Sequence, residues 1–202
     1  MQADTAINVY IAHSKPILAA GLAAILSRTD AVEVCPQHQV LPSLTDDSIV
    51  IIDYEGGLAY RREMQARKVQ NGARVMIVTQ CDKEHQVRIA MDSGVQGYVL
   101  QGCEVQELEH AVQLLKRGMR YLSASLTSCV ADSLRREHLT NRETEVLKLV
   151  AAGYGNKAIA RELGIGLGTV KSYVKTVMSK LDANGRTQAV VVADQRGLLD
   201  AA

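Results

Sequence analysis

Residues 139–181 read LTNRETEVLKLVAAGYGNKAIARELGIGLGTVKSYVKTVMSKL, a stretch with repeated helix signals and no strand signal. Thr140 with Glu143 three residues later is the capping-box pattern of a helix start, and Gly153 is a typical residue just past a helix end. Three more helices are expected. Asn156 caps the second, which ends at Gly164; Gly166 caps the third, which runs to Leu181; and Asn184 caps the fourth, which ends before Gly197. The stretch therefore predicts an all-α unit of four helices.

The third of these helices, from about Leu167 to Leu181, has two different faces. Its apolar residues form one stripe at helical spacing: Val170, Val174, Val177, Met178 and Leu181. The opposite face is small, polar and cationic: Gly168, Lys171, Ser172, Lys175 and Ser179. No acidic residue lies between Glu162 and Asp182. Such a face suits a helix in the major groove of DNA, although an ordinary solvated helix face is the alternative.

The order of motifs in residues 139–190 resembles the LuxR-type helix-turn-helix domain. The matching residues are Leu139-Thr140, Arg142-Glu143, Glu145, Gly153, Asn156-Lys157, Ile159-Ala160, Thr169-Val170-Lys171, Lys180-Leu181 and Arg186-Thr187. Two positions depart from the family pattern, since Gly166 replaces the usual Ser cap and Tyr173 stands where His is common. Neither change removes a permanent cation, so DNA binding is expected to be retained.

The resemblance assigns roles to individual residues of this unit. It implies that Lys171, Ser172 and Lys175 face the bases of double-stranded DNA. By the same resemblance, three residues lie nearer the DNA backbone: Asn156, Lys157 and Thr169.

The last helix carries Val190 and Val191 near its middle, where domains of this type usually pair. A homodimer would read two half-sites roughly 34 Å apart. The alternative is that both valines pack into the domain's own core.

The N-terminal half alternates short apolar runs with amphipathic segments. Five runs are candidate strands: residues 7–12, 32–34, 48–53, 74–79 and 97–100. Apolar residues at helical spacing follow the first and the last of these runs. Residues 57–69 and 83–92 are weaker helix candidates. This βαβα order predicts an α/β fold with a five-stranded parallel sheet covered on both faces.

Together with the helical unit, residues 6–120 resemble the receiver domain of NarL/FixJ-type response regulators, which has a flavodoxin-like fold. The predicted organisation is a receiver-like domain over 1–121, a linker helix over 122–138 and a helix-turn-helix domain over 139–202.

The predicted receiver lacks most of its usual phosphorylation chemistry. By resemblance, Asp53 matches the phosphoacceptor and Thr79 the hydroxyl after the fourth strand. His13 and Ser14 stand in place of the acidic pair, and Gln101 stands in place of the Lys. Mg²⁺ prefers several oxygen ligands in near-octahedral order, which this set does not offer.

We therefore expect regulation without phosphorylation, with Asp53 in a structural role, pairing with His13 or accepting hydrogen bonds from loop amides. Conventional phosphorylation at Asp53 is the alternative. Three replacements are open: a constitutive dimer, a small molecule or partner protein in the altered pocket, or a metal or redox site using Cys81, Cys103 and His85. Constitutive or partner-controlled activity is favoured over a metal site, because the Cys and His spacing matches no metal motif.

Length and composition limit the other classes of protein. The 202 residues suffice for two domains, and 47% hydrophobic and 22% charged residues are ordinary globular composition. Lys and Arg number 12 against 14 Asp and Glu in residues 1–121, and 11 against 8 in residues 122–202, so the basic excess lies in the C-terminal part. The sequence indicates no signal peptide and no membrane span, so a cytosolic location is expected.

No cofactor and no metal ion are expected. An enzyme is the alternative from another class, but no G-x-S-x-G, phosphate-binding Gly-rich loop or H-E-x-x-H motif supports it. A protein that only sequesters a related regulator in mixed dimers is a third possibility, against which the basic helix face argues.

Overall fold

The computed structural model describes residues 6–29, 32–35, 48–69, 72–133 and 136–199. The chain divides into two compact units. Unit 1 contains residues 1–82 and 87–128, and unit 2 contains residues 83–86 and 129–202. Among the described residues, no helix is long and apolar enough to span a membrane.

Unit 1 is built on a parallel sheet with the strand order β2-β1-β3-β4-β5-β6. Its strands are β1 (Ile7–Ala12), β2 (Val32–Cys35), β3 (Ser48–Ile52), β4 (Arg74–Thr79), β5 (Gly97–Leu100) and β6 (Tyr121–Leu122). The parallel α/β fold is confirmed, but the expected number of five strands is wrong. The sixth strand has two residues, too few to show a two-residue period in the sequence.

The strand β6 is held at the sheet edge by backbone and side-chain hydrogen bonds. Gly97 and Tyr98 of β5 pair with Tyr121 and Leu122. The Tyr121 and Ser123 hydroxyls both donate to Oε1 of Glu107, at 3.1 and 2.6 Å. The edge strand thus depends on contacts made by residues distant in sequence.

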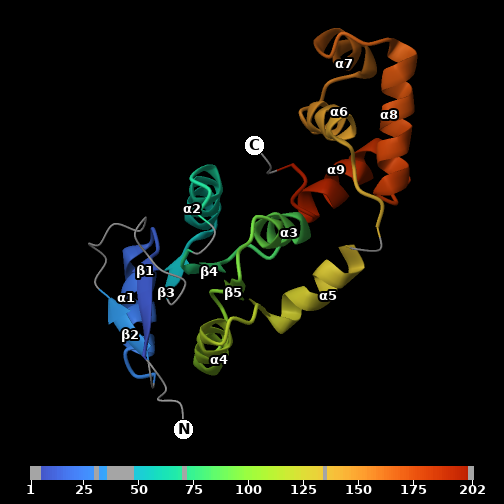
Figure 1. The fold of residues 1–202 in the computed structure, drawn as a ribbon. Helices are drawn as coiled ribbons and strands as arrows, with labels where there is room; N and C mark the ends of the chain where they lie inside the picture. Colours follow the sequence, from blue (N-terminus) through green and yellow to red (C-terminus); the bar gives the residue numbers. More distant parts are fainter. Residues whose placement is uncertain (1–5, 30–31, 36–47, 70–71, 134–135, 200–202) are drawn as a thin grey trace. The chain divides into compact units, whose positions relative to one another are not determined.

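Helices cover both faces of the sheet, as expected for parallel strands. The helices of this half are α1 (Pro16–Leu26), α2 (Tyr54–Ala66), α3 (Glu84–Asp92) and α4 (Val105–Lys116). Figure 1 shows α2 on one side of the strands and α4 on the other. Buried residues of α1 and α4 form one core cluster with alternate residues of the strands: Leu22, Leu26, Leu108, Val112 and Leu115 with Val9, Ile11, Ile49, Ile51, Met76, Val78 and Val99.

The glycine pair in the sequence YEGG lets α2 approach the opposite face of the sheet closely. A Cβ atom on Gly56 would lie 2.8 Å from the Ile52 side chain, and one on Gly57 would lie 2.8 Å from the Ile77 side chain. Real Cβ atoms do not show such distances, so a larger residue at either position requires the neighbouring isoleucine side chain to move.

The helix α5 (Ala124–Ser133) follows β6. It lies within the predicted linker helix over 122–138, of which residues 134–135 lie outside the described residues.

The C-terminal part of unit 2 consists of four helices, as predicted. They are α6 (Asn141–Ala151), α7 (Asn156–Glu162), α8 (Leu167–Lys180) and α9 (Arg186–Gln195) (Figure 1). The Thr140 side chain accepts a hydrogen bond from the Glu143 amide, and the Glu143 carboxylate accepts one from the Thr140 amide, so the capping box is confirmed. Gly153 has a φ of 86°, the left-handed conformation that stops α6.

Two predicted helix starts are wrong by one residue. The N-cap of α7 is Gly155 rather than Asn156, and the N-cap of α9 is Gly185 rather than Asn184. At each of these starts a glycine in an extended conformation is the last residue before the helix. Asn156 instead uses its side-chain oxygen to accept a hydrogen bond from Arg186 at 3.3 Å.

Candidate functional site

The helix α8 separates a buried apolar stripe from an exposed polar face. Val170, Val177 and Leu181 are buried, and Val174 and Met178 pack against the same cores. The exposed residues of the helix include Gly168, Thr169, Lys171, Ser172, Lys175 and Ser179. No acidic residue occurs in the first turn of α8. The side chains predicted to reach bases, Lys171, Ser172 and Lys175, thus lie on solvent-facing positions of one helix.

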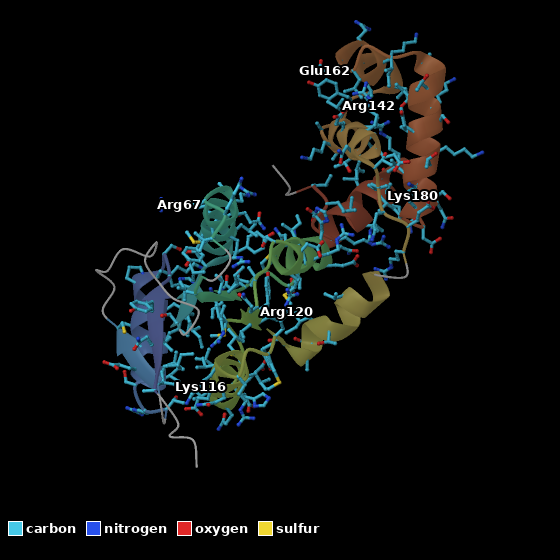
Figure 2. The ribbon with its side chains drawn as sticks, in the orientation of Figure 1. Arg67, Lys116, Arg120, Arg142, Glu162 and Lys180 are labelled. Carbon is cyan, nitrogen blue, oxygen red and sulfur yellow. The ribbon has the colours of Figure 1, made fainter. Side chains whose placement is uncertain are left out.

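Lys180, labelled in Figure 2, links the carboxyl end of α8 to the start of α6. Its Nζ donates to Oε2 of Glu143 and to the His138 carbonyl, both at 3.0 Å, and lies 3.5 Å from the Glu137 carboxylate. Only 10% of the Lys180 side chain is exposed. The hydrogen bond to Glu143 raises the pKa of Lys180 above its ordinary value. Lys180 therefore has a structural role rather than a free cationic one.

Burial by itself raises the pKa of Glu143, but hydrogen bonds from Thr140 and Lys180 outweigh that effect and lower it. A carboxylate that accepts such bonds is stabilised in its charged form.

The turn between α6 and α7 and the start of α8 place the residues expected near the DNA backbone. Lys157 and Thr169 are exposed, and Asn156 is half-buried. Arg186 donates to the Asn156 side chain and to the Tyr154 carbonyl, so it joins α9 to this turn. Tyr173, which departs from the family pattern, packs against the core beneath α8.

The two valines of α9 have different environments. Val190 is half-buried and packs against the cluster formed by Val146, Val150, Ile159 and Val170. Val191 is 49% exposed. Of the two, only Val191 presents much of its surface to a partner.

In unit 1, Asp53 caps α2 and joins two loops at the carboxyl edge of the sheet. Its Oδ1 accepts a hydrogen bond from the Gly56 amide at 2.8 Å, and its Oδ2 accepts one from the Ser14 amide at 2.9 Å. Partial burial raises the pKa of Asp53, but these hydrogen bonds outweigh burial and hold it below the ordinary value. Of the two structural roles expected for Asp53, the bonds to loop amides are present.

His13 is buried, 3% exposed, and both of its ring nitrogens are in use. The Lys15 amide donates to Nδ1 at 3.0 Å, and Nε2 lies 3.0 Å from the Val78 carbonyl oxygen. Because Nδ1 accepts a hydrogen bond, Nε2 carries the proton and donates to Val78. His13 thus joins β1 to β4 through these hydrogen bonds, and its effect on Asp53 is electrostatic.

Thr79 and Gln101 lie at the ends of the two neighbouring strands. The Thr79 hydroxyl oxygen accepts from the Cys81 amide at 3.2 Å, and the Gln101 amide donates to the Thr79 carbonyl at 2.8 Å. The carboxyl ends of β1, β3, β4 and β5 therefore gather all five residues predicted for the altered pocket: His13, Ser14, Asp53, Thr79 and Gln101.

This set of side chains does not fit the Mg²⁺ ion that receiver chemistry uses. Asp53 supplies the only carboxylate among those five residues, and two amide N–H groups already occupy it. In the part of the chain that the structure describes, no three His, Cys, Asp or Glu side chains are grouped so that they could hold a metal ion. Burial and, second, the neighbouring Glu107 raise the pKa of Cys103, which disfavours its reactive thiolate.

Two structural links escaped the sequence-based prediction. Arg142, labelled in Figure 2, donates to the Leu163 carbonyl at 2.8 Å and so joins α6 to the end of α7. The buried Tyr98 donates its hydroxyl proton to the Cys81 carbonyl at 2.8 Å. No sequence signal could have found these bonds, because the carbonyl acceptors belong to the backbone and lie 21 and 17 residues away.

Comparisons with known proteins agree with this architecture. The transcriptional regulatory protein DesR of Bacillus subtilis (strain 168) is 28% identical over 95% of this chain and 98% of its own. The response regulator protein VraR of Staphylococcus aureus is 28% identical over 96% of this chain and 99% of its own. The structure of the two-component response regulator RcsB in complex with DNA has a TM-score of 0.68, with 23% identity over 95% of this chain and 99% of that one.

The family match and the two curated relatives define the class of protein: a DNA-binding transcription regulator of response-regulator type. The RcsB structure agrees with the fold, a receiver-like α/β domain before a helical domain. Residues 137–193 belong to the bacterial regulatory proteins of the luxR family, and the whole chain is homologous to NarL/FixJ-type response regulators.

Proposed function

We propose that this chain binds a specific DNA operator through the exposed face of α8 and does so without phosphorylation of Asp53. The observation that carries the proposal is that the chain combines an exposed basic face on α8 with an Asp53 carboxylate that already accepts two hydrogen bonds. Lys171 and Lys175 are exposed on α8, whereas both oxygens of Asp53 accept amide hydrogen bonds. As a regulator of transcription, the protein acts in the cytosol, where its DNA lies.

Lys171, Ser172 and Lys175 contact base edges and adjacent phosphates in the major groove, and Thr169, Asn156 and Lys157 support the contact with the backbone. The exposed positions of both lysines on one helix face support this assignment. A homodimer forms through α9, with Val191 as its exposed apolar contact, because Val190 is largely used by the domain's own core.

The DNA contact is tested by selecting an operator from random duplexes with untreated protein and measuring affinity by gel shift. Lys171→Ala and Lys175→Ala each weaken specific binding at least about tenfold, the cost of a lost base contact. Lys148→Ala, on α6, is the matched control and leaves the affinity unchanged. Equal affinity of all three variants would refute the role of α8.

The independence from phosphorylation is tested on the same operator with Mg²⁺ and acetyl phosphate. We expect no labelling of the chain and no change in affinity, because the pocket lacks the carboxylates for the metal. Labelling of Asp53 together with tighter DNA binding would instead establish conventional phosphorylation.

A further inference from the structure

A cavity of about 660 Å³ lies between α1 and α4 at the carboxyl edge of the sheet. Its walls are mainly aliphatic, and α1 contributes most of them: Ile17, Leu18, Gly21, Leu22 and Ile25, with Val105 and Leu108 from α4. Pockets of roughly 300–1,000 Å³ with apolar walls and a few polar groups are the usual sites for small molecules. The volume and the lining of this cavity both satisfy that description.

We propose that this cavity binds a small amphipathic molecule with an aliphatic body and an anionic head group. The signal would then enter the receiver-like domain as a ligand, in place of a phosphoryl group.

The polar part of the cavity shares two residues with the altered pocket. Ser14 and Gln101, which replace an acidic residue and the Lys of the receiver pattern, both line the cavity. Gln80 and Lys15 lie in the same wall. The substitutions that remove the phosphorylation chemistry therefore supply hydrogen-bonding groups next to an apolar space.

Gly21 supports a ligand at this site because it has no packing role within the described residues. It lies in the middle of α1, and a Cβ atom added to it would meet no described atom within 4 Å. Glycine weakens a helix interior, so a glycine without a close neighbour leaves open space at some cost in helix stability. That open space belongs to the cavity.

Two other apolar side chains of the wall are unusually exposed. Ile17 is 91% exposed, and Val105 is 45% exposed. Contiguous exposed apolar surface beside a cavity indicates a binding site, because water is a poor partner for it. An aliphatic ligand body would cover both.

The charge of the head group follows from Lys15 and the first turn of α1. Within the described residues Lys15 makes no ion pair, and α1 has no acidic residue in its first turn and no side-chain cap there. The partial positive charge of the helix start adds to that of Lys15. Glu104, the one carboxylate of the lining, is the N-cap of α4 rather than of α1, so we place the anionic head group at Lys15 and the first turn of α1.

The site is tested by calorimetry on the full chain with decanoate, and with decan-1-ol as the uncharged probe of the same body. Decanoate binds saturably, one per chain, with a Kd below about 1 mM. Gly21→Leu places a side chain inside the cavity. Because its Cβ meets no described atom within 4 Å, the variant should stay folded and bind at least about tenfold more weakly. Ala24→Leu is the matched control, because Ala24 is an exposed residue of the same helix outside the lining, and it binds as the wild type does.

Lys15→Gln separates the head group from the body. The substitution weakens the binding of decanoate by about threefold, the usual effect of losing an exposed ion pair, and leaves the binding of decan-1-ol unchanged. Absence of saturable decanoate binding, or equal binding by Gly21→Leu, overturns the proposal. A wild type that binds no probe but is a dimer, which Gly21→Leu dissociates, also overturns it and assigns the surface to a second copy of the chain.

The regulatory part of the inference rests on the proposed function and has its own readout. Decanoate changes the operator affinity of the wild type but not that of Gly21→Leu. Calorimetry needs no DNA, so it tests the ligand site separately. A chain that binds decanoate but no operator would refute the proposed function and leave the ligand site standing. If bound decanoate leaves the operator affinity of the wild type unchanged, the ligand site stands but its role as a signal input is refuted.

Discussion

Lys180, at the last position of α8, donates a hydrogen bond to Oε2 of Glu143, in the first turn of α6, at 3.0 Å. The same oxygen accepts a hydrogen bond from the Thr140 amide at 2.7 Å, so one carboxylate closes the capping box and holds the end of α8. The orientation of α8 therefore depends on a bond between two helices that are separated along the chain.

Lys180→Met should lower the melting temperature of the helical domain, because it leaves the largely covered Glu143 carboxylate without its cation. Lys175→Met is the control on the same helix, since Lys175 is exposed, and should leave the melting temperature unchanged. Thermal denaturation followed by circular dichroism measures both. Equal melting temperatures for the two variants would show that the Lys180 bond contributes nothing.

The stability of α6 should depend on acid through Glu143. The pKa of this carboxyl is lower in the folded chain than its ordinary value of 4.5, so its contribution is fully present above that value. The contribution is lost as the pH falls through the lower folded pKa, because the unfolded state then binds more protons. Amide hydrogen exchange of α6 between about pH 6 and pH 3 measures this slope. Glu143→Gln should flatten it at the cost of lower stability near neutral pH.

Asp53→Ala should lower the free energy of unfolding by about 1 kcal/mol, because Asp53 is the N-cap of α2 and Gly56 would lose its acceptor. Asp53→Asn should keep more of the stability, since Asn is also a good N-cap. Chemical denaturation measures the difference. Operator affinity should be the same for both variants and the wild type, and a loss of affinity in either would argue for a signalling role of Asp53.

His13→Asp restores one carboxylate of the receiver pattern but should not restore its chemistry. The position is buried, and a carboxylate cannot donate to the Val78 carbonyl as Nε2 does. We expect a loss of about 1–3 kcal/mol in the free energy of unfolding, the usual cost of a buried unpaired polar group. Denaturation and labelling by acetyl phosphate test the two parts, and a stable, phosphorylated variant would contradict both.

The same substitution at two helical glycines should have opposite effects. Gly21→Ala should raise the free energy of unfolding by about 0.5–1 kcal/mol, because alanine is the better helix former and the new Cβ meets open space. Gly57→Ala should lower it by about 1–3 kcal/mol, because the new Cβ would lie 2.8 Å from Ile77. Chemical denaturation of both variants provides the comparison, and a shared sign would refute the packing argument for Gly57.

Much of the fold was predictable because its elements have local signals. Five strands follow from short apolar runs, and the four C-terminal helices follow from apolar residues at a period of 3.6 and from their caps, with the Thr140–Glu143 capping box local to four residues. The sixth strand was not predictable, since Tyr121 and Leu122 are too few for a sequence pattern and their contacts are tertiary: they pair with β5, and Glu107 accepts hydrogen bonds from the Tyr121 and Ser123 hydroxyls. The caps at Gly155 and Gly185 were missed because adjacent Asn residues have the stronger intrinsic capping preference.

By itself, the sequence determined that α8 has a basic face without carboxylates, since this is a matter of residue type and spacing. The resemblance to receivers predicted that His13, Ser14 and Gln101 stand in place of the acidic pair and the Lys. Only the tertiary structure decided what the remaining side chains do. His13 bonds Val78, and Asp53 bonds the amides of Ser14 and Gly56. Their partners are backbone groups, which carry no residue identity, and folding alone brings such groups within hydrogen-bonding distance.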